Sequence, residues 1–146
     1  MSSDFRHLVY PRGMKLTRLL LAVSALLLAV AGCSPSTQAT PGVARVDVAE
    51  FATIITEPGV QIIDVRTPEE FADGHINGAV NIPVQQPDFA DRVAALDPSA
   101  TYAVYCRSGN RSQPAVAAMR DAGITNIYEL QSGTKGWTAA GQPLTR

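Results

Sequence analysis

Apolar residues between positions 43 and 146 gather in five short runs, and most of them are rich in Val, Ile or Tyr. Short, almost continuous runs of this kind are typical of strands that are covered on both faces, as in a parallel sheet. The runs predict strands at 43–46, 60–65, 78–83, 101–105 and 126–130.

The segments between these runs have helical spacing of their apolar residues. In the first of them, Val48, Phe51, Ile54 and Ile55 share one helical face behind a capping Asp47. Strands that alternate with helices indicate a single α/β domain over 43–146, with a parallel sheet of about five strands and helices on both faces. The expected helices are 47–56, 67–73, 88–96, 113–121 and 133–140.

The N-terminal part has a different pattern. Met14-Lys15-Leu16-Thr17-Arg18 is a short basic start, and the apolar run 19–31 that follows is shorter than the roughly 20 residues of a membrane-spanning helix. This order indicates a signal peptide at 14–32. Its end, Val30-Ala31-Gly32-Cys33, resembles the bacterial lipobox, which implies cleavage before Cys33 and lipidation of its thiol.

This interpretation also assigns the segments on either side of the signal peptide and predicts where in the cell the domain lies. Residues 1–13 precede the better start at Met14 and are interpreted as an over-long gene start, and 33–42 lack large apolar residues and form a flexible tether. The domain is then expected to be exported and lipid-anchored to the bacterial cell envelope, outside the cytoplasm. A plain signal peptide, or a buried helix with an incidental cysteine, remains the alternative.

Charge and cysteine content narrow the class of protein. The chain has 12 Lys/Arg and 13 Asp/Glu, and residues 1–32 hold four of the basic residues but only Asp4 of the acidic ones. The remainder carries eight basic and twelve acidic residues, a formal charge of about −4. We therefore expect no nucleic-acid partner. If Cys33 is lipidated, Cys106 has no disulfide partner in the chain.

The candidate chemistry lies at Cys106-Arg107-Ser108-Gly109-Asn110-Arg111-Ser112, between a predicted strand and a predicted helix. A helix N-terminus and nearby arginines favour a thiolate over a thiol. Gly109 allows successive amides to point inwards, which predicts an anion-holding loop around the sulfur. Four residues separate Cys106 from Arg111. Cysteine phosphatase loops have five, so this loop suits a single extra sulfur better than a phosphate.

Further motifs stand before and after the loop. They are Asp64-Val65-Arg66, Glu69-Glu70-Phe71, Gly74-His75-Ile76-Asn77-Gly78-Ala79-Val80-Asn81-Ile82-Pro83, Leu130-Gln131-Ser132-Gly133, Trp137 and Gly141-Gln142-Pro143. Together with the loop, these motifs resemble the single-domain rhodaneses over roughly 43–144. Ser132 departs from the family pattern, in which a second glycine is common, and this affects the turn before the last helix.

The resemblance implies a rhodanese-like fold and a sulfurtransferase. Cys106 would take the outer sulfur of a donor such as thiosulfate, and the loop amides from Arg107 to Ser112 would hold the resulting persulfide. A thiol or cyanide-like acceptor would then remove the sulfur. This chemistry needs no metal and no organic cofactor, and we expect a monomer.

Several other residues have expected roles around the loop. Arg111 is expected to form an ion pair with Glu70 that stabilises the loop. Asp64 and Arg66 follow the end of a neighbouring strand and are expected to support the loop from there. Arg107 either attracts the anionic donor or is simply solvated. His75 is interpreted as part of a structural turn, because a preformed thiolate needs no general base.

Two alternative functions remain open at this stage. A binding or regulatory rhodanese module would use the fold without turnover, but such modules commonly lack the cysteine that is present here. A phosphatase or arsenate reductase on the same fold is disfavoured by the loop length.

The lipid anchor is tested by Cys33→Ala. Without the thiol no lipid can be attached, so the protein should leave the membrane fraction or accumulate unprocessed. Fractionation of cells and the mass of the mature chain measure this. Unchanged membrane retention of a processed chain would contradict lipidation of Cys33.

Overall fold

The computed structural model describes residues 42–146 of the 146-residue chain. The over-long start, the signal peptide, Cys33 and the tether up to residue 41 lie outside the described residues, so these interpretations stay predictions. Within 42–146, no helix is long and apolar enough to cross a membrane.

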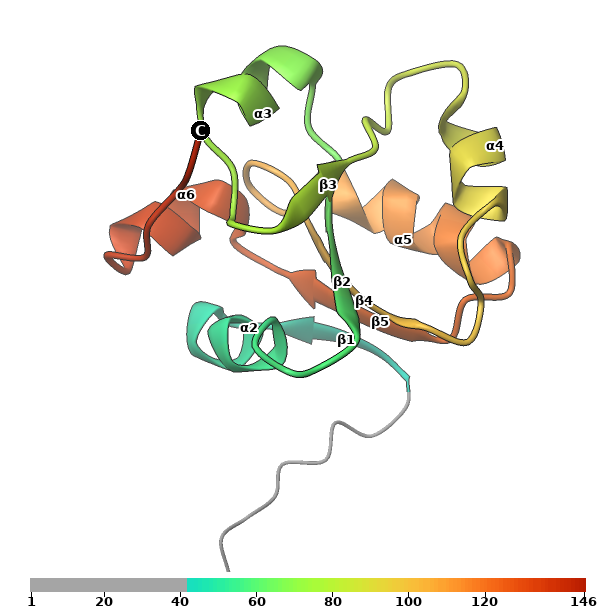
Figure 1. The fold of residues 1–146 in the computed structure, drawn as a ribbon, viewed down its shortest axis with the longest axis horizontal. Coiled ribbons are helices and arrows are strands. Elements are labelled where there is room, and N and C mark those ends of the chain that lie inside the picture. The colour runs from blue at the N-terminus through green and yellow to red at the C-terminus, as the bar shows by residue number, and fades with distance from the viewer. Residues whose placement is uncertain (1–41) are drawn as a thin grey trace, which may run out of the picture. The chain divides into compact units, whose positions relative to one another are not determined.

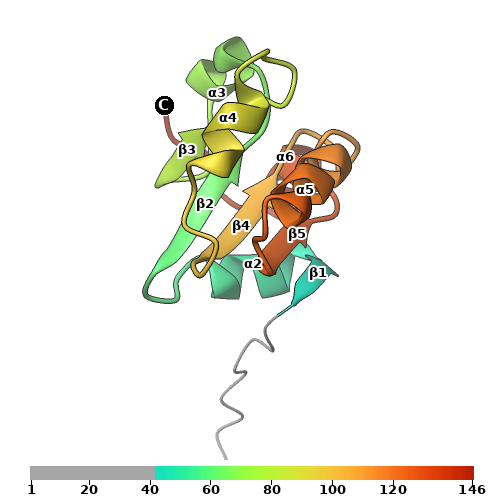
Figure 2. The same ribbon diagram turned by 90° about the vertical axis from the view of Figure 1, so that its right-hand side faces the viewer.

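Five parallel strands form one sheet in the order β1-β5-β4-β2-β3, which confirms the expected α/β architecture. Figure 2 shows this order, with β4 in the middle of the sheet. The strands are β1 (Val43–Val46), β2 (Val60–Asp64), β3 (Ala79–Asn81), β4 (Thr101–Tyr105) and β5 (Asn126–Leu130).

Helices cover both faces of the sheet, also as expected. Helices α2 and α6 lie on one side, and α4 and α5 lie on the other (Figure 1). The helices are α2 (Val48–Ile54), α3 (Pro68–Asp73), α4 (Phe89–Ala94), α5 (Ser112–Asp121) and α6 (Gly133–Ala139).

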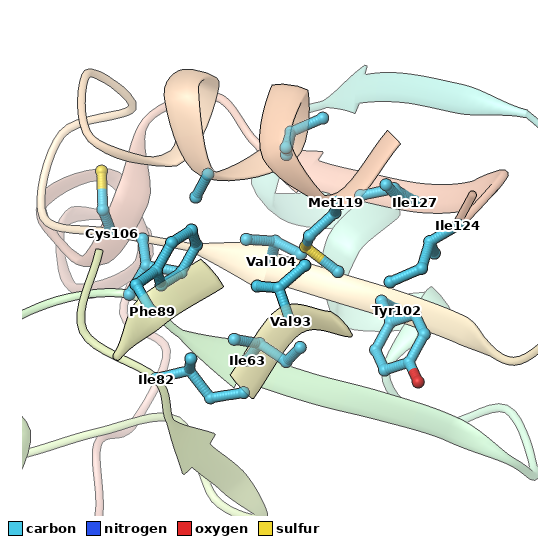
Figure 3. Packing of buried hydrophobic residues seen from close by; sticks show 13 residues of the cluster. Ile63, Ile82, Phe89, Val93, Tyr102, Val104, Cys106, Met119, Ile124 and Ile127 are labelled. Atoms are coloured by element: carbon cyan, nitrogen blue, oxygen red, sulfur yellow. The ribbon is translucent and has the colours of Figure 1, made fainter. Parts of the chain in front are cut away.

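Successive residues of each central strand alternate between two apolar clusters. On β4, Val104 packs towards α4 and α5, whereas Ala103 and Tyr105 pack towards α2 and α6. This alternation explains why the strand is apolar throughout. Figure 3 shows the cluster beneath α4 and α5, in which Val104 and Cys106 lie on the same face of the sheet.

Some elements are shorter than the sequence pattern predicts. Strand β3 spans Ala79–Asn81 rather than 78–83, because Gly78 adopts a φ of 84° in the preceding turn and Pro83 has no N–H to donate. Helix α4 ends at Ala94 instead of 96, three residues before Asp97. The Leu96 N–H donates to the Val93 carbonyl three residues back, at 3.1 Å, so the chain after Ala94 forms a tighter turn than an α-helix.

Candidate active site

Cys106 follows directly after the last residue of β4, at the carboxyl edge of the sheet. The loop then reverses the chain, and α5 begins at Ser112. Only 1% of Cys106 is exposed, and its side chain belongs to the apolar cluster beneath α5. The position agrees with the rule that ligands of open α/β sheets bind beyond the carboxyl ends of strands.

Polar groups of the loop surround the sulfur. The Gly109 N–H donates to Cys106 Sγ at 3.1 Å, and Ser112 Oγ lies 3.5 Å from Sγ. Burial raises the pKa of the Cys106 thiol, but hydrogen bonds from Ser112 and from the amides of Ser108 and Arg111 outweigh burial and lower it below the usual value. The loop thus favours the thiolate, as the sequence predicts.

The loop packs directly against the backbone that connects β5 to α6. Gly109 has a φ of 81°, and a Cβ atom there would overlap the Gln131 carbonyl. Gly133 has a φ of 58°, and a Cβ atom there would overlap the backbone of Cys106, Arg107 and Ser108. Glycine is required at these positions both for the left-handed conformation and for the close approach.

Helix α6 fixes the carbonyl groups of the same loop. The Thr134 N–H donates to the Cys106 carbonyl at 2.9 Å, and the Lys135 N–H donates to the Arg107 carbonyl at 3.0 Å. These are amides of the first turn of α6, which have no partner inside the helix. These two hydrogen bonds fix the first residues of the loop, just before the Gly109 amide that faces the sulfur.

Arg111 binds Glu70 with two hydrogen bonds, of 2.6 and 2.7 Å, so the expected ion pair is present. Glu70 lies in the first turn of α3, where it also accepts the Thr67 N–H at 3.1 Å in a capping box. The hydrogen bond from Arg111 is the main reason why the pKa of Glu70 falls to about 2. This pair connects the loop to α3.

Asp64 and Arg66 form a second, buried pair. Arg66 Nη2 donates to Asp64 Oδ2 at 2.6 Å and to the Gly74 carbonyl at 2.8 Å. These hydrogen bonds join the end of β2 to the end of α3, which carries Glu70. Support of the loop by Asp64 and Arg66 is therefore indirect and runs through α3.

A small pocket of about 240 Å³ opens beside the loop, and two arginines contribute to it. Arg107 is exposed, whereas Arg66 is buried. Ser108 and Asn110 are also exposed, whereas Ser112 is fully buried. Among residues 42–146, no three His, Cys, Asp or Glu side chains converge as metal ligands. The pocket residues are Arg66, Glu70, Asp73, Gly74, Arg107, Thr134 and Leu144.

His75 takes part in a structural turn. Its ring stacks on Phe71 at 3.8 Å, and Nδ1 lies 3.0 Å from the Phe71 carbonyl. Its backbone exchanges two hydrogen bonds of 2.8 Å with Thr145. Trp137 is 3% exposed and packs against Phe51 in the core, with its indole N–H on the Pro143 carbonyl.

Sequence reasoning missed one polar group of the site, Glu129. It lies on β5 and is 2% exposed, and Oε1 accepts a hydrogen bond of 2.7 Å from Ser112 Oγ. The other carboxylate oxygen, Oε2, lies 2.9 Å from Arg45 Nε. An acidic residue between Tyr128 and Leu130, in a run that is otherwise mainly apolar, was the available signal for it.

A model of the rhodanese-like domain family matches residues 47–140. The chain belongs to the rhodanese-like domain family. It is similar to the thiosulfate sulfurtransferase GlpE of Pseudomonas aeruginosa strain LESB58, with 39% identity over 88 residues that cover 60% of this chain and 78% of the relative. It is also similar to the chloroplastic thiosulfate sulfurtransferase 16 of Arabidopsis thaliana, with 36% identity over 95 residues that cover 58% of this chain and 79% of the relative.

A solved structure supports the same assignment. The rhodanese-related protein of Thermoplasma volcanium superposes with a TM-score of 0.62 at 30% identity, covering 69% of this chain and 96% of that protein. The rhodanese-like fold predicted from the motifs is therefore confirmed. Relatives that carry the name thiosulfate sulfurtransferase place the chain in a family that includes sulfurtransferases.

The close approach at Gly133 is tested by Gly133→Ala. The left-handed conformation costs an alanine about 1 kcal/mol, and the overlap with the loop adds to this, so the free energy of unfolding should fall by more than about 2 kcal/mol. The displaced loop should also change the rate at which Cys106 is alkylated. Urea denaturation and alkylation, resolved by peptide mass spectrometry, measure the two effects.

Gly123→Ala is the matched control, because Gly123 has a φ of 88° with nothing within 4 Å of a Cβ atom. The free energy of unfolding of Gly123→Ala should fall only by the cost of the left-handed conformation, about 1 kcal/mol, and the rate of alkylation of Cys106 should not change. Equal behaviour of the two variants would contradict the close approach.

The pair of Arg111 and Glu70 is tested by the pH dependence of stability. Because the pKa of Glu70 is lowered from 4.5 to about 2, the pair stabilises the folded state fully above pH 4.5. This stabilisation is lost as the pH falls through about 2. Glu70→Gln keeps the capping box but lacks the charge, so it should be less stable than wild type at neutral pH, by about 1 kcal/mol because solvent screens the pair.

The difference in free energy of unfolding between wild type and Glu70→Gln should shrink below pH 4.5. Urea denaturation at several pH values measures it, with Glu57→Gln as a control outside the pair. A difference that stays constant down to pH 2 would contradict this interpretation.

Proposed function

We propose that this protein is a sulfurtransferase that moves a sulfane sulfur from an anionic donor such as thiosulfate to a thiophilic acceptor, with Cys106 as the sulfur carrier. The observation that carries the proposal is the contact of 3.1 Å between the Gly109 amide and Cys106 Sγ, inside a loop with four residues between Cys106 and Arg111. Membership of the rhodanese-like family, and relatives that are named thiosulfate sulfurtransferases, support the same reaction.

The first half-reaction is a displacement at sulfur. The Cys106 thiolate attacks the outer sulfur of thiosulfate, a new S–S bond forms, and the old S–S bond breaks with its electron pair leaving on sulfite. The exposed guanidinium of Arg107, in the pocket beside the loop, offers the anionic donor an opposite charge. The outer sulfur of the persulfide is then the anion that the loop amides hold.

The second half-reaction returns the enzyme to its starting state. A nucleophilic acceptor, such as a thiol or cyanide, attacks the outer sulfur, and the Cys106 thiolate leaves. Carriage of the sulfur on the enzyme between two separate substrates is covalent, ping-pong catalysis. The thiol pKa, lowered by the loop, makes Cys106 both a ready nucleophile and a good leaving group.

The loop length also bears on the phosphatase or arsenate reductase alternative. Four residues separate Cys106 from Arg111, one fewer than in cysteine phosphatase loops, and the shorter loop favours a single extra sulfur over a phosphate. A silent binding module remains the second alternative, and turnover is the measurement that separates it from an enzyme. We further propose that the enzyme acts outside the cytoplasm, on the basis of the lipobox-like sequence that ends at Cys33.

The proposal is tested on the purified full-length chain with thiosulfate as donor and cyanide as acceptor. Wild type should form thiocyanate, and Cys106→Ser should abolish this activity because no persulfide can form. Incubation with thiosulfate alone should add one sulfur atom to the Cys106 peptide, and a reductant should remove it. Absence of turnover and of the added sulfur, together with hydrolysis of an aryl phosphate, would overturn the proposal.

A further inference from the structure

Glu129 is a buried carboxylate for which the proposed reaction gives no role. Its position follows from the register of the sheet, in which Arg45 on β1 pairs with Glu129 on β5. The Arg45 guanidinium lies 2.9 Å from Oε2 and is half exposed, whereas the carboxylate is 3% exposed. The ion pair therefore keeps a negative charge inside the domain, next to the base of the sulfur-carrying loop.

Ser112 connects this charge to the sulfur. Its Oγ lies 3.5 Å from Cys106 Sγ and 2.7 Å from Glu129 Oε1. A hydroxyl group has a single hydrogen, and the short contact to a carboxylate oxygen is where that hydrogen is donated. In this arrangement Ser112 presents only lone pairs to the sulfur, which suits a thiol that donates. The hydrogen bond from Ser112 that lowers the pKa of Cys106 forms only when the hydroxyl turns from Glu129 to the thiolate.

We propose that Glu129 competes with the Cys106 thiolate for the single hydrogen of the Ser112 hydroxyl, and that Glu129 is thereby a positioning residue that sets how readily Cys106 ionises. The inference deepens the proposed function, since it concerns the nucleophile of sulfur transfer. When the Cys106 S–H bond breaks and its proton passes to water, the Ser112 hydroxyl turns to the sulfur. Glu129 Oε1 then loses its donor within a buried site.

The groups around Glu129 indicate that it acts on Cys106 through the Ser112 hydroxyl, and not only through the electric field of its charge. Arg45 faces it from β1, and Val104, its neighbour in register on β4, is apolar. Arg111, one of the two cations of the loop, is engaged by Glu70. Among the described residues, Arg45, Ser112 and, through Ser112, Cys106 are thus the polar groups placed on this carboxylate.

Glu129→Gln separates charge from shape. The amide can keep its oxygen on Arg45 and donate from its nitrogen to Ser112 Oγ, which frees the hydroxyl hydrogen for the sulfur. The variant also removes a negative charge close to the thiolate. Both changes favour ionisation, so Cys106 should ionise at a pH about one unit lower than in wild type. Alkylation at pH values below the midpoint should then be about tenfold faster.

The experiment measures the pH profile of iodoacetamide alkylation in the full-length chain without any sulfur donor. Peptide mass spectrometry separates Cys106 from Cys33. Glu50→Gln, an exposed carboxylate on α2, should keep the wild-type midpoint. In a Ser112→Ala background the shift caused by Glu129→Gln should be less than half as large, because no hydrogen is left to share.

An unchanged or raised midpoint in Glu129→Gln, or a full-sized shift in the Ser112→Ala background, would overturn the proposal. If Glu129→Gln does not fold, Arg45→Met provides the second test, since Arg45 is half exposed and Glu129 is retained. Loss of the compensating charge should raise the midpoint, and an unchanged or lowered midpoint would contradict the proposal. Alkylation without a donor is independent of sulfur transfer, so the failure of one proposal is distinguishable from failure of the other.

Discussion

The close contact between two backbone segments, 106–109 and 131–135, is the constraint on which the rest of the site depends. Strands β4 and β5 are parallel neighbours, so the segments that follow them leave the sheet at the same carboxyl edge and have to pass each other there. Gly109 and Gly133 remove the side chains that would separate them, and two amides of α6 bind the loop carbonyls. The geometry around Cys106 is thus set by β5 and α6 as much as by its own loop.

Asp64, Glu70 and Glu129 lie around this site, and each is paired with an arginine that offsets its charge. Glu70 and Arg111 tie the loop to α3, and Asp64 and Arg66 tie α3 to the end of β2. Glu129 and Arg45 add a charge pair from the far edge strand, β1. The site therefore draws on four of the five strands or their ends, although only one short loop contacts the sulfur.

The parts of this arrangement that were predictable are those encoded in local sequence. The strand runs, the capping residue Asp47 and the loop motif predicted the fold and the place of Cys106, and the family motifs led to the pair of Arg111 and Glu70. The coupling of Glu129 to Arg45 was not predictable in the same way. It depends on which strands are neighbours and in which register, and an apolar run does not encode either property. The early end of α4 was not predictable either, because Leu96 bonds the Val93 carbonyl in a tighter turn that the spacing of apolar residues does not distinguish from an α-helix.

The shared hydrogen of Ser112 also bears on the loaded state of the proposed sulfurtransferase. In the free thiolate the negative charge is on Cys106 Sγ, so the sulfur and the Glu129 carboxylate are two anionic acceptors for the one hydrogen of Ser112. In the persulfide the charge has moved to the outer sulfur, and the inner Sγ is neutral. The hydroxyl can then return to Glu129 at no cost to the anion, which the loop amides hold. On this reasoning a buried carboxylate beside a nucleophilic thiol, which is unfavourable for the empty enzyme, favours the enzyme that carries sulfur.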